Sequence, residues 1–162
     1  MAKPPHDRSI GLSRTFFVSA KTWQSRALFR SERLAQLFTE TLLDYRAQGK
    51  YRLHEFVLMP DHFHLLLTPA PGVTLERALQ FIKGGFSHRA GRTVSRTLEI
   101  WQRGYVDHRV RDENDYLHHR DYIRLNPVRA HLAAAPEDYR YGSAHRSFQL
   151  DAPPQGLKPS TW

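Results

Sequence analysis

Short apolar runs alternate along the chain with longer stretches in which apolar residues repeat at helical spacing. Runs rich in aromatic, β-branched and leucine residues predict four strands: RTFFVSA (14–20), YRLHEFVLM (51–59), FHLLLTP (63–69) and IWQRGYVDHRV (100–110). Pro60 and Asp61 form a turn between the second and third runs, which predicts an antiparallel hairpin. Gly104 is expected to bend the fourth strand.

Three stretches have the apolar spacing of amphipathic helices, and each begins after a residue suited to capping. Ser31 is the expected N-cap of the first helix, which should end near Gly49. Thr74 can cap the second helix and Asp112 the third, and the third is expected to stop at Pro127.

The order strand, helix, strand, strand, helix, strand, helix predicts an α+β fold of ferredoxin/RRM-like type, with an antiparallel sheet and helices packed on one face. Gly84 and Gly85 weaken the second helix and can let its backbone approach a ligand. Residues 1–146 are expected to form one domain. Residues 147–162 carry Pro and Gly without periodicity, which predicts a C-terminal tail that is mobile or ordered by a ligand.

The charge balance of the chain gives information on its binding partner. Lys and Arg total 24 against 16 Asp and Glu, a formal net charge of +8, and most of the cations are Arg. The planar guanidinium pairs with phosphate, so the composition favours a nucleic-acid partner, with a basic domain that has no polyanion partner as the alternative. No cysteine, no apolar run of membrane-spanning length and no apolar leader occur, which fits a cytoplasmic protein without a membrane partner.

Two histidines stand out at the head of the third strand. His62 and His64 are two residues apart, so their side chains leave the same face of the strand. Two imidazoles on one face can bind a metal ion, or they can be hydrogen-bonded structural histidines. With no cysteine available, any further ligand must be His, a carboxylate or an amide.

The third helix supplies a matching pair of polar groups. Tyr122 and Asn126 are four residues apart, so they lie within about 40° of one another on one helix face. Leu117 and Ile123 are expected to pack against the sheet. His62, His64 and Asn126 can hold a divalent cation that polarises a phosphate, and Tyr122 can attack the phosphorus to give a phosphotyrosine. A half-buried structural tyrosine is the alternative, and Tyr116 on the same helix is the competing nucleophile.

These motifs resemble a known family. MPDHFHLLL is similar to the histidine–hydrophobic–histidine ("HUH") signature of single-tyrosine transposases of the IS200-like group. WQ and DYIRLNPVRA are similar to segments of their REP-associated branch, the REP-associated tyrosine transposases, and the resemblance covers roughly residues 14–146. It implies an HUH endonuclease fold, and cleavage and transfer of single-stranded DNA at palindromic hairpins. It also implies a 5′-phosphotyrosine intermediate that leaves a free 3′-hydroxyl.

Carried onto this chain, the resemblance makes His62 and His64 metal ligands and Tyr122 the nucleophile, with Mg²⁺ or Mn²⁺ as cofactor. The third ligand in relatives from insertion sequences is a Gln four residues after the tyrosine, and here that position is Asn126, which is shorter by one methylene. Relatives often have the motif NPVRAGL, and this chain has His131 in place of its glycine. The REP-associated branch implies a monomer, whereas relatives from mobile elements are dimers that share active sites, so both states stay open. The expected location is the bacterial cytoplasm, in association with the nucleoid.

Several cationic side chains are candidates for contacting DNA, although a solvated basic surface explains them nearly as well. They are Arg8, Arg14, Lys83, Arg89, Arg92, Arg96, His118 and His119. Two other functions stay open from the residues: a hairpin-binding protein with weak or no cleavage, which Asn126 keeps in consideration, and an RNA-binding domain on the same type of sheet. The RNA alternative needs exposed aromatic residues on the central strands, where FHLLLTP supplies leucines.

Overall fold

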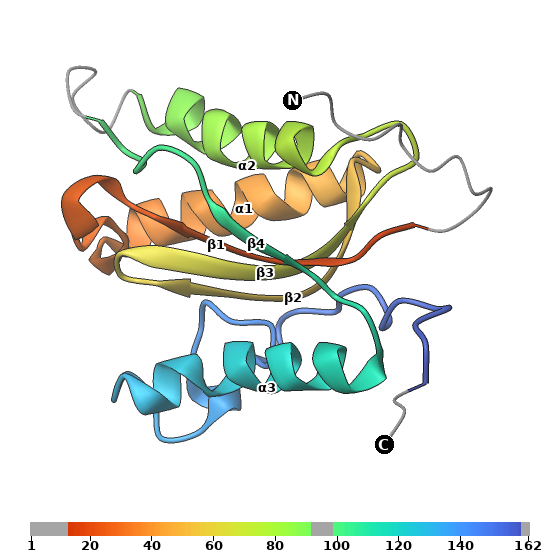
Figure 1. Cartoon of the computed structure of the whole chain (residues 1–162). Coiled ribbons are helices and arrows are strands. Elements are labelled where there is room, and N and C mark those ends of the chain that lie inside the picture. Colours follow the sequence, from red (N-terminus) through yellow and green to blue (C-terminus); the bar gives the residue numbers. More distant parts are fainter. Residues whose placement is uncertain (1–12, 92–98, 160–162) are drawn as a thin grey trace.

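A four-stranded antiparallel sheet forms the centre of the molecule (Figure 1). The computed structural model describes residues 13–91 and 99–159. The strands are β1 (Phe16–Lys21), β2 (Tyr51–Met59), β3 (His62–Pro69) and β4 (Val106–Arg109), in the spatial order β2-β3-β1-β4. Every neighbouring pair is antiparallel, and β2 and β3 form the predicted hairpin. The sheet therefore matches the predicted α+β class.

Helices cover both faces of this sheet. Helices α1 (Glu32–Ala47) and α2 (Leu75–Ala90) lie together on one face, and α3 (Glu113–Arg129) lies on the other (Figure 1). The expectation that the helices share one face thus holds for α1 and α2 only. The cause is visible in β3, whose leucines are apolar in both directions: Leu65 and Leu67 face α1 and α2, whereas Leu66 packs with Ile123 of α3.

The main core lies between the sheet and the α1–α2 layer. Its centre is a group of aromatic rings from five parts of the chain: Phe29, Phe38, Phe63, Phe86 and Trp101. Gly85 lets the two helices approach closely, because a Cβ at this position would lie 2.6 Å from the ring of Tyr45 in α1. The close approach at Gly85 is thus to a neighbouring helix and not to a ligand.

The helix starts follow the predicted capping. The side chains of Ser31, Thr74 and Asp112 each accept a hydrogen bond from a backbone amide three residues later. The predicted stop at Pro127 is wrong, because α3 continues to Arg129. Pro127 lies in the last turn of α3, where it is buried.

The predicted fourth strand forms only in part. The backbone of Gly104 has φ +76°, and regular pairing with β1 begins at Val106, while Trp101 makes an isolated bridge to Thr22. Three short 3₁₀ turns complete the described secondary structure: Trp23–Ser25, Leu28–Arg30 and Pro136–Asp138. No helix in the described ranges has the length and apolarity to cross a membrane.

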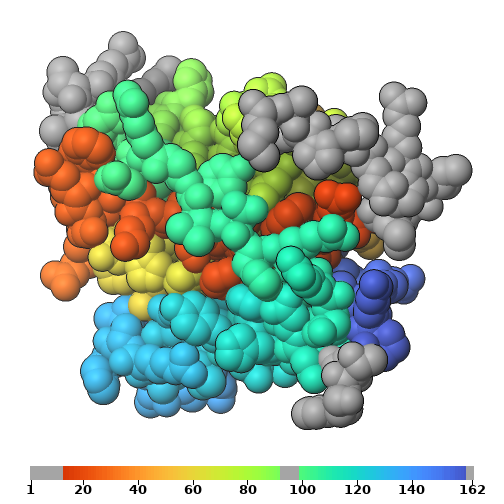
Figure 2. All heavy atoms as spheres, viewed as in Figure 1, coloured from red at the N-terminus to blue at the C-terminus, as the bar shows by residue number. Residues whose placement is uncertain are grey.

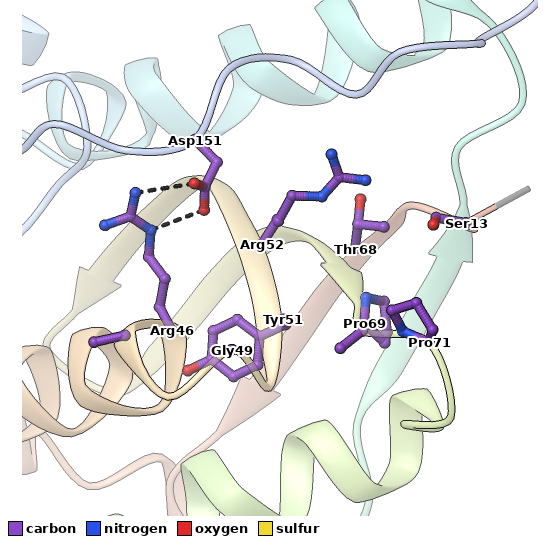
Figure 3. Close-up of a pocket in the computed structure, with 11 residues that line it drawn as sticks. Ser13, Arg46, Gly49, Tyr51, Arg52, Thr68, Pro69, Pro71 and Asp151 are labelled. Atoms are coloured by element: carbon purple, nitrogen blue, oxygen red, sulfur yellow. Dashed lines mark hydrogen bonds and ion pairs between the residues drawn. The ribbon is translucent and has the colours of Figure 1, made fainter. Parts of the chain in front are cut away.

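The C-terminal segment up to residue 159 is extended, as expected, but it is anchored to the domain. Asp151 forms an ion pair with Arg46 of α1 at 2.8 Å (Figure 3). Its carboxylate also accepts a hydrogen bond from the backbone amide of Leu53. Further along, the carbonyl of Lys158 accepts the amide of Glu113 at the start of α3. Figure 2 shows this segment, in blue, beside the start of α3. These contacts attach residues 147–159 to α1, β2 and the start of α3.

Candidate active site

The two histidines of β3 point to the α3 face of the sheet, and each has one ring nitrogen fixed by a neighbour. Nδ1 of His62 lies 2.6 Å from a carboxylate oxygen of Asp61. Nδ1 of His64 lies 2.5 Å from the hydroxyl of Ser19, its cross-strand partner on β1. The ring centroids of His62 and His64 are 4.8 Å apart. When Nδ1 carries the proton, each ring presents the lone pair of Nε2.

His64 is the more deeply buried of the two, with 6% of its surface exposed. Its Nε2 is the one buried side-chain polar atom within residues 13–91 and 99–159 that lacks a hydrogen-bond partner. Burial, followed by the nearby His62, lowers the pKa of His64 to about 3. The imidazole is therefore neutral at physiological pH, which is the form that can bind a metal ion.

Tyr122 of α3 contacts His64. Its ring centroid is 5.2 Å from that of His64, in an edge-to-face arrangement, and 37% of the residue is exposed. Phe17 of β1 contacts both rings, with centroids 5.5 Å from His64 and 5.9 Å from Tyr122. The guanidinium of Arg129 lies 5.8 Å from the Tyr122 ring centroid. The exposed phenol of Tyr122 thus has the buried imidazole of His64 on one contact and the cation of Arg129 on another.

Burial distinguishes Tyr122, the candidate nucleophile, from Tyr116, the competing tyrosine on α3. Tyr116 is buried against the sheet, and burial raises its pKa to about 12. Ile123 is fully buried, as predicted, whereas Leu117 is 40% exposed and does not pack against the sheet. Asn126 follows Tyr122 by one helical turn and is half-buried.

The residues fit a divalent cation at the end of the sheet where β2 and β3 connect. The unpartnered Nε2 of buried His64 is the observation that supports this fit, because a buried nitrogen acceptor without a partner is costly unless a ligand satisfies it. The contact between Asp61 and His62 has the carboxylate–histidine arrangement that orients metal-binding imidazoles. A mixed site of this kind, completed by waters and phosphate oxygens, suits Mn²⁺ and is tolerable for Mg²⁺.

The sequence did not indicate the supporting residues Ser19, Phe17 and Arg129. Ser19 is recognisable only from the β1–β3 register, which places it opposite His64. The sequence indicates a turn at Asp61 but not its contact with His62.

The predicted DNA-contacting residues divide between the two faces of the sheet. His118 is exposed on α3, and the ring of His119 packs on Phe17 at 4.6 Å. Lys83 and Arg89 belong to α2, on the face away from Tyr122, and both have internal partners: Lys83 donates to two carbonyls near Gly104, and Arg89 pairs with Asp44. Arg14 is exposed before β1, whereas Arg8, Arg92 and Arg96 lie outside the described residues.

A pocket lies at the opposite end of the sheet, away from the histidines. Its lining includes Arg46, Tyr51, Arg52, Thr68 and Asp151, as Figure 3 shows. Tyr51 and Arg52 are at the start of β2 and Thr68 is near the end of β3, whereas His62 and His64 are at the start of β3. The pocket is therefore separate from the candidate active site.

Comparison with known proteins identifies the family. The model of the family described as "Transposase IS200 like" matches residues 18–126, a span that contains both histidines, Tyr122 and Asn126. The chain belongs to the IS200-like transposase family. Within this family it is similar to the REP-associated tyrosine transposase of Escherichia coli K12, at 26% identity over 92% of this chain and 88% of that protein.

The fold of this IS200-like transposase also has a solved counterpart. A structure described as a REP-associated tyrosine transposase bound to a REP hairpin superposes with a TM-score of 0.71 and 24% identity. The match covers 90% of this chain and 84% of that one. The predicted α+β fold and the resemblance to the REP-associated branch are both confirmed.

Proposed function

We propose that this chain is a metal-dependent single-strand DNA endonuclease and strand transferase that acts at REP-type palindromic hairpins. The observation that carries the proposal is the juxtaposition of Tyr122 with the unpartnered Nε2 of His64. Membership of the IS200-like transposase family and the hairpin bound by the solved relative support the choice of substrate. The net charge of +8 suits a polyanionic partner.

Tyr122 is the nucleophile in this proposal. Its phenolic oxygen loses its proton and forms a bond to the phosphorus, and the bond from phosphorus to the 3′ oxygen breaks. The departing 3′ oxygen takes up a proton in exchange. The products are a 5′-phosphotyrosine and a free 3′-hydroxyl, and the hydroxyl of another DNA end reverses the step to transfer the strand. Arg129, beside the Tyr122 ring, is placed to contact the phosphate.

His62, His64 and Asn126 would hold the divalent cation, Mg²⁺ or Mn²⁺. The cation supplies charge stabilisation at the phosphate. Asp61 and Ser19 each contact Nδ1 of one imidazole, which leaves Nε2 of both rings as the ligand atom. We propose that the protein acts as a monomer, and the contact between His64 and Tyr122 of the same chain supports this. We place this activity in the bacterial cytoplasm, at the nucleoid.

The test is formation of a covalent adduct with a labelled single-stranded hairpin in Mn²⁺. The wild-type chain should give a species that survives denaturant, and chelator should abolish it. Tyr122→Phe should give no adduct while its affinity for the hairpin stays within about twofold, because one hydroxyl is a small part of the phosphate contacts. Tyr141→Phe, at a half-buried tyrosine beside the main core, is the matched control and should form the adduct.

Two results would contradict the proposal. An adduct in the Tyr122→Phe protein would reject the nucleophile. Hairpin binding by the wild-type chain without any adduct, in either metal, would favour the alternative of a binding protein without cleavage.

A further inference from the structure

A second cluster of metal-ligating side chains lies where β4 meets the first half of α3. His108 comes from β4, and Asp115 and His119 are one turn apart on α3. One ligand atom from each of the three residues lies within 4.8 Å of the other two. Within the described parts of the chain, no other three His, Cys, Asp or Glu residues come together in this way.

The sheet register directs His108 toward α3. His108 is the cross-strand partner of Phe17, so both side chains leave the sheet on the face that α3 covers. The rings of His108 and His119 stack with centroids 4.8 Å apart and an interplanar angle of 23°. Phe17 separates this cluster from His64, because its ring contacts His119 on one side and His64 on the other.

Asp115 holds both imidazoles through its carboxylate. Nε2 of His108 lies 2.7 Å from one oxygen, and Nδ1 of His119 lies 3.1 Å from the other. Burial opposes ionisation of this carboxyl group, but hydrogen bonds from His108 and the amide of Arg111 bring its pKa below the usual value. The group is therefore an anionic ligand at neutral pH. About a fifth of the Asp115 and His119 side chains is exposed, and 45% of that of His108.

We propose that His108, Asp115 and His119 bind a divalent transition-metal ion, with Zn²⁺ preferred, at a site separate from the His62–His64 centre. Two imidazoles and one carboxylate suit Zn²⁺ or Co²⁺ better than Mg²⁺, which prefers oxygen ligands. Nδ1 of His119 also lies 2.8 Å from the carbonyl oxygen of Asp115, so ion binding replaces this hydrogen bond. The exposed side of His108 leaves room for water or a phosphate oxygen to complete the coordination.

The proposed metal site joins β4 to α3, and this position determines what a bound ion would do. Within the sheet β4 is an edge strand that pairs with β1 and is exposed along its length, so it has few other contacts with α3. In Figure 2 the green of β4 meets the cyan of the start of α3 on the exposed face. The ion ties this edge strand to the helix that carries Tyr122, three residues after His119. It therefore stabilises the helix and does not take part in the proposed cleavage.

The test uses the untagged full chain after treatment with chelator. The variant His62→Ala/His64→Ala removes the first centre, and it should still bind one equivalent of Co²⁺, followed by visible absorption, and one of Zn²⁺, followed by calorimetry. Adding His108→Ala should weaken this binding by at least about tenfold. His118→Ala, at the exposed neighbour on the same helix, is the matched control and should retain the equivalent.

A second measurement covers the case in which the multiple variants fold poorly. The wild-type chain should bind two equivalents of Co²⁺ and the His108→Ala chain one, and Zn²⁺ should raise the melting temperature of the His62→Ala/His64→Ala protein. A hundredfold excess of Mg²⁺ should not displace the second Co²⁺.

If folded His62→Ala/His64→Ala protein binds no Co²⁺, or if His108→Ala leaves its binding unchanged, the three residues form only a hydrogen-bonded cluster and the proposal is wrong. Neither result depends on adduct formation, so the Tyr122 assay stands or fails separately.

Discussion

Arg124 on α3 forms an ion pair with the carboxylate of Glu55, which is buried in β2 on the face of the sheet that α3 covers. Nε of Arg124 donates to Glu55 at 2.9 Å, and the hydroxyl of Ser143 donates to the other carboxylate oxygen. The Glu55 side chain is 4% exposed and that of Arg124 is 44% exposed. Because Arg124 is two residues after Tyr122, this ion pair fixes the position of the helix that carries the proposed nucleophile.

Arg124→Ala should therefore destabilise the fold and slow adduct formation. The substitution leaves the buried Glu55 carboxylate without its charged partner, which costs about 1–3 kcal/mol of unfolding free energy. Urea denaturation measures this cost. A helix that is less firmly placed should lower the rate of adduct formation by about 10- to 100-fold, because attack at phosphorus depends on close positioning of Tyr122.

Arg120→Ala provides the matched control. Arg120 pairs with Asp121 on the helix surface, where an exposed ion pair contributes about 0–1 kcal/mol. Equal effects of the two substitutions on stability and rate would show that the contact with Glu55 has no special role.

Ser19→Ala should weaken metal use without affecting hairpin binding. The substitution removes the hydroxyl that contacts Nδ1 of His64, so the ring is free to rotate and Nε2 is less well presented. Loss of such a supporting partner costs about 10- to 100-fold in metal affinity. The measurement is the Mn²⁺ concentration that gives half-maximal adduct. Ser87→Ala on α2, on the far side of the sheet, is the control and should leave this concentration unchanged. An unchanged concentration in Ser19→Ala as well would show that the Ser19 hydroxyl has no role in metal binding.

The metal-free protein should lose stability as the pH falls from about 6.5 toward 3. Burial and the charge of His62 lower the pKa of His64 to about 3, whereas an imidazole in the unfolded chain has a pKa near 6.5. Between these values the unfolded chain binds a proton that the folded chain does not. Protonation therefore favours unfolding, with a slope of up to about 1.4 kcal/mol per pH unit. Burial also lowers the pKa of His54, which adds to the slope in the same direction.

Urea denaturation in chelator at several pH values between 4 and 7 measures this slope. His64→Gln removes the titrating group and should give a shallower dependence than wild type. Identical slopes would mean that the folded protein protonates His64 as readily as the unfolded chain does.

The elements of the fold were predictable because their signals are local. Caps at Ser31, Thr74 and Asp112 and the apolar strands depend on residues close in sequence, and the structure has them where they were expected. The second apolar face, which α3 covers, is legible in β3, whose leucines are apolar in both directions. The sequence does not indicate an irregularity in β2 between Leu53 and Glu55, which shifts the alternation. This shift directs Glu55 toward α3, and no pattern of neighbouring residues predicts the shift.

The candidate site divides in the same way. His62 and His64 are recognisable from their spacing along one strand, and Tyr122 and Asn126 from their spacing along one helix. Ser19 and Phe17 approach these residues only through strand register, which places Ser19 opposite His64 across 45 residues of sequence and depends on the complete sheet.

Asn126 allows a last prediction, on whether its amide serves as the third metal ligand. Asn126→Leu keeps the size of the side chain and removes the oxygen, so it should raise the Mn²⁺ concentration for half-maximal adduct by about tenfold or more. Asn126→Asp supplies an anionic oxygen at the same reach and should lower that concentration, because carboxylates bind Mn²⁺ more strongly than amides do. A side chain that only packs would give the opposite order, since Leu would be tolerated at this half-buried position and a carboxylate would not. The order of the two variants therefore decides between ligation and packing, and hairpin affinity measured in chelator checks that both proteins are folded.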